Sequence, residues 1–211
     1  REAVRGFVAR ELKPLAAELD RLEQLERHFP LALFDQASRM GLRTLSLAEQ
    51  AGGAGADSLT ACIVAEELAA GDVGVAATLS ETARLAHEWF DAMMSPEQRA
   101  RFLPAFLADE RYHLAYAAHE PDARLEWRYH RPSTGEASCA ATAVRAGGGD
   151  WIVNGMHKFV ANAPVAKLFA VEVASEGGAS GPGGKHTLLV PRELPGLEVR
   201  EYEQESQQPG P

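Results

Sequence analysis

The residues best suited to binding a charged aromatic ligand lie between positions 124 and 131, in the run RLEWRYHR. Three arginines alternate there with a tryptophan and a tyrosine, and such a composition can stack on a base and hold phosphate groups. The alternative is a surface loop whose aromatic side chains pack against the neighbouring domain. One such segment in an acidic chain favours the surface loop.

A second candidate for ligand chemistry is the glycine-rich stretch AGGAGAD at 51–57. A phosphate-binding loop follows a strand and carries a lysine or the full dinucleotide-binding spacing. This stretch has neither, so we predict a loop between helices. The seven histidines include no H-E-x-x-H motif, and the chain has no G-x-S-x-G elbow. The sequence therefore predicts neither a metal site nor a serine hydrolase.

Charge and cysteine content restrict the partners and the compartment. The 211 residues carry a formal charge of −9 with a pI near 5.3, which argues against a general nucleic-acid or anionic-membrane surface. The longest apolar region, 59–79, is interrupted by acidic residues, and the start REAVRGF contains no signal-peptide core. Cys62 and Cys139 fit neither a disulfide framework nor a zinc site and are expected to pack. We predict a cytoplasmic protein that binds neither nucleic acid nor membrane.

Apolar residues at helical spacing predict an all-helical domain over 1–110. The two glutamates at 66 and 67 are expected on a helix face in water. The signals that bound or bend the helices are, in chain order, Pro14 as a kink or break, Pro30 at a first helical position, Gly41 as a stop, a cap at Asp57 or Ser58, a cap at Asp72, and a capping box at 95–98.

After residue 110 the apolar period changes from 3.6 to 2, which predicts a small β-barrel or sandwich domain over 111–203 and a flexible tail over 204–211. Asn154-Gly155 is the preferred dipeptide of a two-residue type I′ turn, so 151–153 and 156–160 are predicted to form a hairpin. The other strands are expected at 113–118, 137–145, 168–173, 187–190 and 197–202. The predicted fold class is α+β, an N-terminal all-α helical bundle followed by this β domain.

Several motifs occur in the order in which the acyl-CoA dehydrogenase family has them, and the chain resembles that family over nearly its whole length. They are EQAGGAGADSLTACIVAEELA at 49–69, YAAHEP at 116–121, WIVNGMHKFVAN at 151–162 and LLVPRELPGLEV at 188–199. The third is similar to the family's N-G-T-K-x-[FW]-[IV]-[TS]-N segment and matches it at Asn154, Gly155, Phe159, Val160 and Asn162. The resemblance implies an acyl-CoA dehydrogenase-like fold whose C-terminal helical bundle is absent from this chain.

The same resemblance implies a flavoprotein oxidoreductase that binds FAD and an acyl-CoA thioester. In the family a glutamate removes a proton from Cα while a hydride leaves Cβ for flavin N5, and the electrons pass to an acceptor such as an electron-transfer flavoprotein. The residues implied at the cofactor are Tyr116, Ala118, His119, Phe159, Val160 and Ala161. Phe159 would cover the isoalloxazine edge, and Ala161 would face N5. The candidates for phosphate contacts of the substrate are Arg124, Arg128 and Arg131.

The chain departs from the family pattern near the implied flavin. Ala161 replaces a threonine or serine, and His119 replaces the threonine of a Thr-Glu-Pro sequence. Residues 122–136 replace an A-G-S-D segment that contacts the flavin phosphates and the pantetheine in the family. The family's catalytic glutamate lies in the C-terminal helices, so no residue of this chain is predicted to be the base.

Three functions remain open on these observations. The first is the N-terminal and middle part of a FAD-dependent acyl-CoA dehydrogenase in acyl-CoA metabolism. The second is a non-catalytic dehydrogenase-like subunit that has lost flavin binding and supports an active partner. The third is other CoA-ester chemistry on the same scaffold. A homo- or hetero-oligomer is expected, because a helical layer and a β domain without the third bundle expose a large apolar face.

Overall fold

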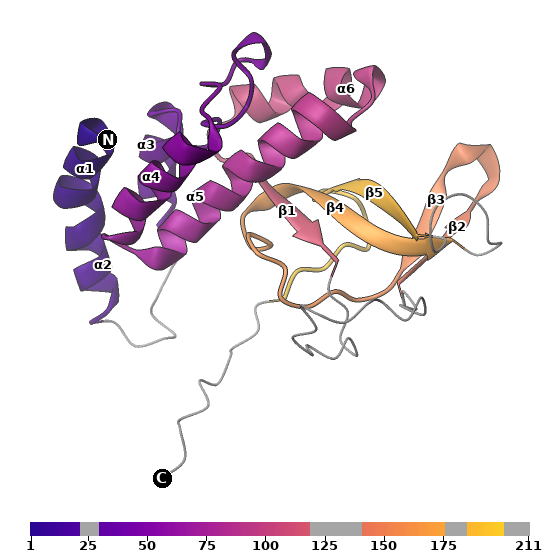
Figure 1. Cartoon of the computed structure of the whole chain (residues 1–211). Coiled ribbons are helices and arrows are strands. Elements are labelled where there is room, and N and C mark those ends of the chain that lie inside the picture. Colours follow the sequence, from indigo (N-terminus) through magenta and orange to yellow (C-terminus); the bar gives the residue numbers. More distant parts are fainter. Residues whose placement is uncertain (22–29, 119–140, 176–184, 201–211) are drawn as a thin grey trace, which may run out of the picture.

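The computed structural model describes residues 1–21, 30–118, 141–175 and 185–200. Helices make up its first half and strands its second, and Figure 1 shows the helices on one side of a curled sheet. The helices are α1 (Glu2–Phe7), α2 (Lys13–Leu19), α3 (Leu31–Arg39), α4 (Ser58–Ala69), α5 (Val73–Ala86) and α6 (Pro96–Ala108). The strands are β1 (His113–Ala117), β2 (Thr142–Arg145), β3 (Trp151–Asn154), β4 (Ala166–Ser175) and β5 (Lys185–Pro191). The predicted α+β fold class is confirmed.

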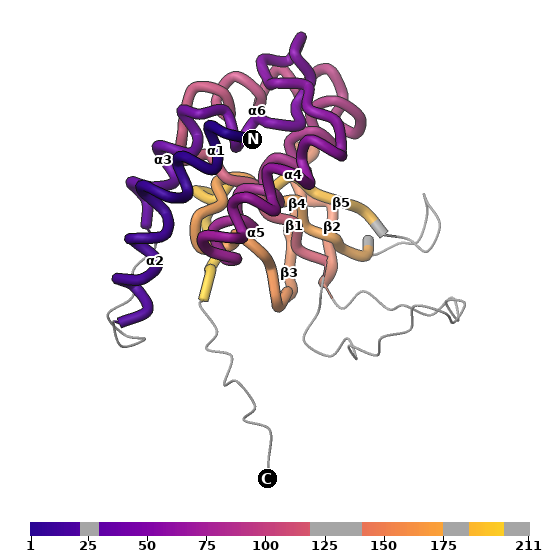
Figure 2. Tube along the Cα trace, turned by 60° about the vertical axis from the view of Figure 1, so that its left-hand side comes forward, coloured from indigo at the N-terminus to yellow at the C-terminus, as the bar shows by residue number. Residues whose placement is uncertain are grey.

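The first predicted helix passes Pro14 without a break. α1 continues through a π-helical segment, Val8–Leu12, into α2, and the backbone at both junctions stays in the right-handed helical region. Proline has no N–H to donate, and its ring excludes the carbonyl four residues earlier, so the widened turn lies directly before it. Figure 2 shows α1 and α2 following one path.

Side-chain oxygens start the three longer helices, as predicted. Asp57 accepts a hydrogen bond from the Thr60 N–H at 2.8 Å ahead of α4, and Asp72 accepts one from the Val75 N–H at 2.8 Å ahead of α5. Both halves of the predicted capping box at 95–98 are present at the start of α6. These bonds satisfy N–H groups that have no partner within their own helix, so the helix starts are fixed locally.

The sheet is organised around β4. β1 pairs with β4 in parallel, with Leu114 opposite Leu168, and β5 pairs with β4 antiparallel along its other edge. β2 pairs in parallel with the last residues of β4 and antiparallel with β3, which gives a five-stranded sheet. The β2–β3 ribbon projects at the far end of the sheet in Figure 1.

The predicted hairpin at Asn154-Gly155 is wrong. β3 pairs backward with β2 around the turn Gly147–Gly149, and 156–160 form no strand. The backbone of Gly155 lies against Ala141, because a Cβ at position 155 would be 2.5 Å from the Ala141 Cβ. This glycine therefore permits close packing and does not form the turn.

Other predictions need smaller corrections. Pro30 is the residue before α3 and not its first helical residue, whereas Gly41 ends that helix at a φ of 79° as expected. No strand forms over 197–200, where partly buried apolar side chains pack against the sheet. Cys62 is exposed and does not pack, and Cys139 lies outside the described residues.

One hydrophobic core joins the helices to the sheet. Leu85, Phe90 and Phe106 from the helical half pack in the same cluster as Leu114 of β1 and Leu168 of β4, each at most 1% exposed. Figure 2 shows α5 beside β1. The shared core fixes the sheet relative to the helices because close-packed side chains leave little room for sliding.

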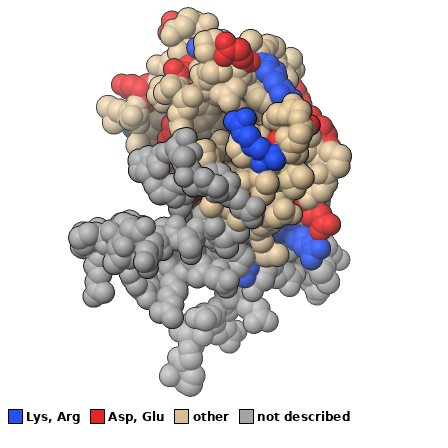
Figure 3. All heavy atoms as spheres, turned by 90° about the vertical axis from the view of Figure 1, so that its right-hand side faces the viewer, with Lys and Arg blue, Asp and Glu red and all other residues tan. Residues whose placement is uncertain are grey.

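The β-domain side of the surface carries charges of both signs. On the face in Figure 3, the Lys and Arg side chains that are drawn stand apart from one another among acidic and neutral surface. Among the described residues of this face, basic groups therefore form no continuous patch.

Glu67 is buried and ion-paired, although it was predicted to face water. Its carboxylate accepts hydrogen bonds from Arg5 Nε at 2.9 Å and Nη2 at 2.6 Å, and from Arg1 Nε at 2.5 Å. These bonds, that of Arg5 foremost, lower the pKa of Glu67 to about 2. The pairing ties the start of the chain to α4.

Replacing Glu67 with glutamine is expected to destabilise the chain at pH 7 and to matter less in acid. The folded-state pKa of about 2 lies below the ordinary 4.5, so the stabilisation is complete above pH 4.5 and disappears as the pH falls toward 2. Urea unfolding of wild type and Glu67→Gln at pH 7 and pH 3 measures the difference. Glu66→Gln removes the same charge from an exposed neighbour and serves as the control. If the two proteins differ in free energy of unfolding by the same amount at both pH values, the ion pairing of Glu67 does not stabilise the fold.

Asp72→Ala is expected to lower the free energy of unfolding by about 1 kcal/mol, because the Val75 N–H loses its acceptor. Asp72→Asn keeps an acceptor oxygen in the same place and is expected to stay close to wild type. Urea unfolding at neutral pH compares the two. A loss of the same size in both variants would show that the cap does not stabilise α5.

Candidate functional site

The candidate site lies where α5 meets the sheet. Side chains alternate along a strand, so Leu168, Ala170 and Glu172 of β4 share one face. Leu168 and Ala170 pack against the helices, and so does Leu114 of β1. Tyr116 follows Leu114 by two residues and lies where helical cover ends, with 37% of its surface exposed. The edge of the helix–sheet core therefore presents a tyrosine and a glutamate.

Tyr116 and Glu172 are directly bonded across β1 and β4. The tyrosine O–H donates a hydrogen bond to the Glu172 carboxylate. Burial raises the pKa of Tyr116 to about 12, and the bond to Glu172 and its charge act in the same direction. The charge of Arg84 on α5 lowers this pKa, and that of Glu88, in the π-helical segment His87–Met93 that follows α5, raises it. Tyr116 is thus held as a neutral phenol among charged groups.

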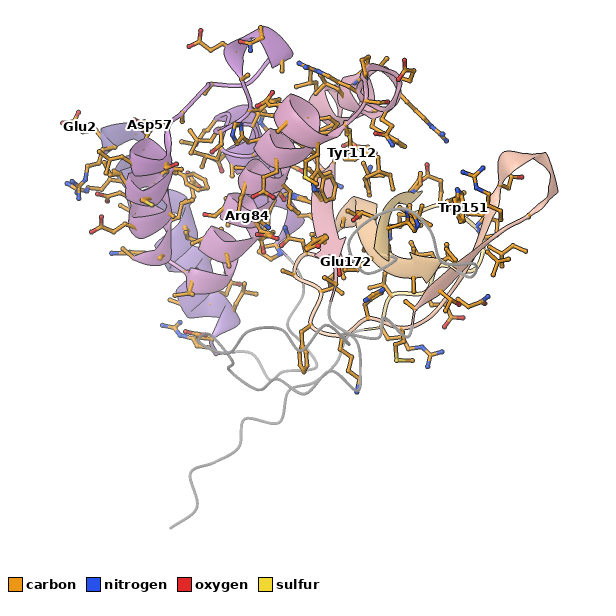
Figure 4. The ribbon with its side chains drawn as sticks, turned by 45° about the vertical axis from the view of Figure 1, so that its right-hand side comes forward. Glu2, Asp57, Arg84, Tyr112, Trp151 and Glu172 are labelled. Atoms are coloured by element: carbon orange, nitrogen blue, oxygen red, sulfur yellow. The ribbon has the colours of Figure 1, made fainter. Side chains whose placement is uncertain are left out.

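Arg84 is held by two carboxylates, one from α5 and one from the π-helical segment that continues it. Its Nε and Nη2 donate to Glu81 at 3.0 and 2.8 Å, and its Nη1 donates to Glu88 at 2.5 Å. The bonds to Glu81 foremost, together with those to Glu88, raise the Arg84 pKa. Figure 4 shows Arg84 on α5 and Glu172 on the sheet near the junction of the two layers. A fixed cation therefore lies beside Tyr116.

A cavity of about 880 Å³ lies on the helical side of this junction. Its walls come from the 42–58 region, α4 and α5, and they include apolar Val64, Leu68 and Leu79. Arg84 and Glu88 also line it, so the same ion pair borders both the cavity and the Tyr116 edge. The AGGAGAD stretch connects the short 3₁₀ turn at Glu49–Ala51 to α4, which confirms the predicted loop between helices.

The segment 159–162 forms the other part of the site. Phe159 is 57% exposed at a φ of 55°, and Ala161 is exposed beside it. Val160, between them, packs against the core of the sheet. Asn162 also has a positive φ, 64°, and its amide donates to the Leu114 carbonyl of β1 at 3.3 Å. Non-glycine residues seldom adopt positive φ, so surrounding contacts hold this backbone in place.

The structure brings some of the predicted cofactor residues to one region. Tyr116 lies near the end of β1, the half-buried Ala118 directly follows that strand, and the loop carrying Phe159, Val160 and Ala161 is bonded to β1 through Asn162. The other predicted residues, His119, Arg124, Arg128 and Arg131, lie outside the described residues.

The described residues contain neither a candidate metal site nor a membrane-spanning helix. Within 1–21, 30–118, 141–175 and 185–200, there is no cluster of three or more His, Cys, Asp or Glu side chains suited to a metal ion. No helix in that part of the chain has the length and apolar content needed to span a bilayer.

Three charged residues at the site were missed by sequence reasoning. Arg84 and Glu88 look like ordinary residues of an amphipathic helix, and Glu172 interrupts an apolar strand. The interruption at Glu172 was a usable signal, because a glutamate within a buried strand needs a partner. Its partner depends on the parallel pairing of β1 with β4, which strand periodicity does not predict.

A helical layer followed by a curled sheet is the acyl-CoA dehydrogenase-like fold, and comparison with known proteins supports this class. Residues 1–110 match the family model "Acyl-CoA dehydrogenase, N-terminal domain". The chain belongs to the acyl-CoA dehydrogenase family.

Relatives of known name cover nearly the whole chain. It is 28% identical over 198 residues to isobutyryl-CoA dehydrogenase, mitochondrial, of Dictyostelium discoideum, which covers 94% of this chain and 44% of that protein. It is 29% identical over 202 residues to the human short-chain specific acyl-CoA dehydrogenase, mitochondrial, with 96% and 45% covered. The crystal structure of a glutaryl-CoA dehydrogenase from Mycobacterium smegmatis in complex with FADH2 is similar at 25% identity and a TM-score of 0.74, with 95% and 46% covered. The chain thus spans less than half the length of these proteins.

Glu172→Gln is expected to lower the pKa of Tyr116 from about 12 toward the value that burial alone gives, because the neutral amide no longer repels the phenolate. Titration of ring-labelled tyrosine by NMR measures it, and Tyr116→Phe assigns the signal. A Tyr116 pKa unchanged by Glu172→Gln would contradict the bond between the two side chains.

Proposed function

We propose that this chain is the N-terminal and middle part of a FAD-dependent acyl-CoA dehydrogenase that desaturates the α,β bond of an acyl-CoA thioester. The observation that carries the proposal is the loop 159–162, which presents Phe159 and Ala161 beside β1 at the α5 junction. Family membership and the FADH2 complex of a similar dehydrogenase support the choice of FAD.

The described residues fit a flat ring system. Phe159 exposes 57% of its surface on a constrained backbone, so it offers an aromatic face with little ordering cost on contact. Ala161 has only a methyl group beyond its backbone, which leaves room for close approach. Tyr116, on the neighbouring strand, gives the site a second exposed aromatic edge.

When bound, FAD supplies the acceptor for the hydride that leaves Cβ. The chain's own part is to place the acyl group and keep the site dry. We assign the acyl group to the cavity beside α5, since Val64, Leu68 and Leu79 give it apolar walls. Tyr116 adds no charge at neutral pH, because its pKa is raised to about 12. Its O–H is already donated to Glu172, so its oxygen is left to accept a hydrogen bond. No residue of this chain is proposed as the base.

Several finer assignments are part of the proposal. His119 replaces a family threonine and is proposed to donate to the flavin, and Arg124, Arg128 and Arg131 are proposed to pair with phosphates on the strength of their charge alone. The domain limit at 110 is also proposed, whereas the limit at 203 and the tail predicted over 204–211 lie outside the described residues. An electron-transfer flavoprotein as acceptor and a homo- or hetero-oligomer are proposed as well. The cytoplasm is the proposed compartment, because the cysteine content suggests a reducing environment. The names of the Dictyostelium and human relatives described above are mitochondrial.

A non-catalytic subunit is the second candidate function. Ala161 and the replaced A-G-S-D segment favour it, because each removes a group that the family uses at the flavin. Such a subunit would keep the fold and its interface and would support an active partner.

A visible absorbance scan with added FAD distinguishes the two functions. The purified chain, expressed with any sequence that follows it or with its partner, is expected to show oxidised-flavin bands that an acyl-CoA bleaches. A folded protein that stays colourless with excess FAD would contradict the enzyme and favour the subunit.

Ala161→Thr is expected to change flavin binding, because it restores a hydroxyl at the flavin-facing position. One added hydrogen bond is worth about 1 kcal/mol, or about a fivefold tighter Kd for FAD. Ala161→Val has nearly the same shape without the hydroxyl and is the matched control. Fluorescence titration with FAD compares the three proteins. An equal change in the threonine and valine variants would rule out the hydrogen bond.

A further inference from the structure

We propose that the partly buried Asn162 and the buried Thr82 and His113 form a hydrogen-bond chain that positions the loop 159–161 relative to α5. Asn162 follows the loop, Thr82 lies in α5, and His113 begins β1. The three residues are positioning residues, since they act on a ligand through the loop. Their role toward the flavin rests on the proposed function.

The Asn162 amide is the start of the chain. Its Nδ2 lies 3.0 Å from the Thr78 carbonyl, 3.1 Å from Thr82 Oγ1 and 3.3 Å from the Leu114 carbonyl. Backbone carbonyls only accept hydrogen bonds, so the NH2 group and not the amide oxygen faces them. One side chain therefore bonds the loop to α5 and to β1 together.

Thr82 passes the hydrogen bonding on to His113. Thr82 Oγ1 accepts from Asn162 and lies 3.0 Å from His113 Nδ1, so the hydroxyl is bonded to both side chains. Burial foremost lowers the pKa of His113 to about 4, so the ring is neutral at pH 7 and holds one proton. A neutral ring and a hydroxyl can share this bond without placing a charge in the core.

Burial raises the free-energy cost of breaking the bond between Thr82 and His113. Thr82 is 0% exposed and His113 is 1% exposed, so water cannot replace a lost partner. The ring of His113 also meets Phe34 edge-on, at 5.5 Å between centroids, which fixes its orientation. Removing the Thr82 hydroxyl therefore takes away an acceptor that holds the Asn162 amide in place.

The loop is held from its other side by the sheet. Arg192 Nη1 donates to the Ala163 carbonyl at 2.7 Å and to the Ala166 carbonyl at 3.2 Å. The turn after Asn162 is thus fixed to the end of β5, while Asn162 itself is fixed to α5. Thr82 is two residues from Arg84, which lines the cavity. The hydrogen bonds from Asn162 to Thr82 therefore link the exposed Phe159–Ala161 surface to α5, which forms part of the cavity wall.

Two matched substitutions separate the hydrogen bonds from shape. Thr82→Val removes the hydroxyl and keeps the volume, whereas Thr82→Ser keeps the hydroxyl. Asn162→Gly keeps the freedom to adopt a φ of 64° and removes the amide, whereas Asn162→Ala removes both. Hydrogen–deuterium exchange of peptides covering 156–163 measures the loop without requiring a ligand. FAD affinity and the flavin absorbance spectrum are measured on the same proteins.

We expect exchange about fivefold to tenfold faster than wild type in Thr82→Val and Asn162→Gly, and unchanged in Thr82→Ser. FAD affinity should fall in the first two and recover in the serine variant, with helix content by circular dichroism unchanged. Exchange equal to wild type in both, or faster exchange with unaltered FAD affinity and spectrum, would overturn the proposal.

Failure of the proposed function is seen in the wild-type protein, whereas failure of the positioning role is seen only in the variants. If wild type binds no FAD, the dehydrogenase assignment fails, and exchange alone decides whether the three residues position the loop. If Thr82→Val does not fold, Asn162→Gly supplies the decision, since its substitution lies outside the helix.

Discussion

Packing of α5 against β1 is the constraint on which the candidate site depends. The two elements share a core with α6 and β4, and they are joined by bonds among buried polar groups that water cannot replace. Because β1 runs parallel to β4 in a fixed register, fixing β1 also fixes the face that carries Glu172. Without this contact, the cavity of the helical half and the exposed loop of the sheet would be independent features.

The polar groups at this junction have different roles according to their exposure. Thr82 and His113 are buried, the partly buried Asn162 bonds to Thr82, and together they determine geometry, since directional bonds away from water tolerate little displacement. Arg84 and its carboxylate partners lie at the rim, where solvent screens them, and they influence the protonation of Tyr116 more than stability. A site that must position a ring and exclude water needs hydrogen bonds such as those of Thr82. A site that must control charge at the substrate needs ion pairs such as those of Arg84.

Local sequence signals predicted what depends on local chemistry. Asp57, Asp72 and the capping box at 95–98 bond to N–H groups within three residues, so their types and spacing were sufficient. The Asn154-Gly155 prediction failed because Gly155 packs against Ala141, the residue before β2, and the dipeptide does not reveal this contact. Glu67 was predicted to face water because its partners, Arg1 and Arg5, lie at the start of the chain, 66 and 62 residues earlier. The family resemblance pointed to Tyr116, Phe159 and Ala161, but the bonds through Glu172 and Thr82 required the tertiary pairing.

The central claim is that the α5–β1 junction and the loop 159–162 together form a flavin site. A crystal structure of the chain with FAD, completed by any following sequence or partner, tests it most directly. We expect the isoalloxazine ring between residues 116–118, at and just after the end of β1, and the Phe159–Ala161 loop, with the Asn162 bonds intact. FAD bound elsewhere, or a ring that displaces Asn162 from Thr82, would contradict it.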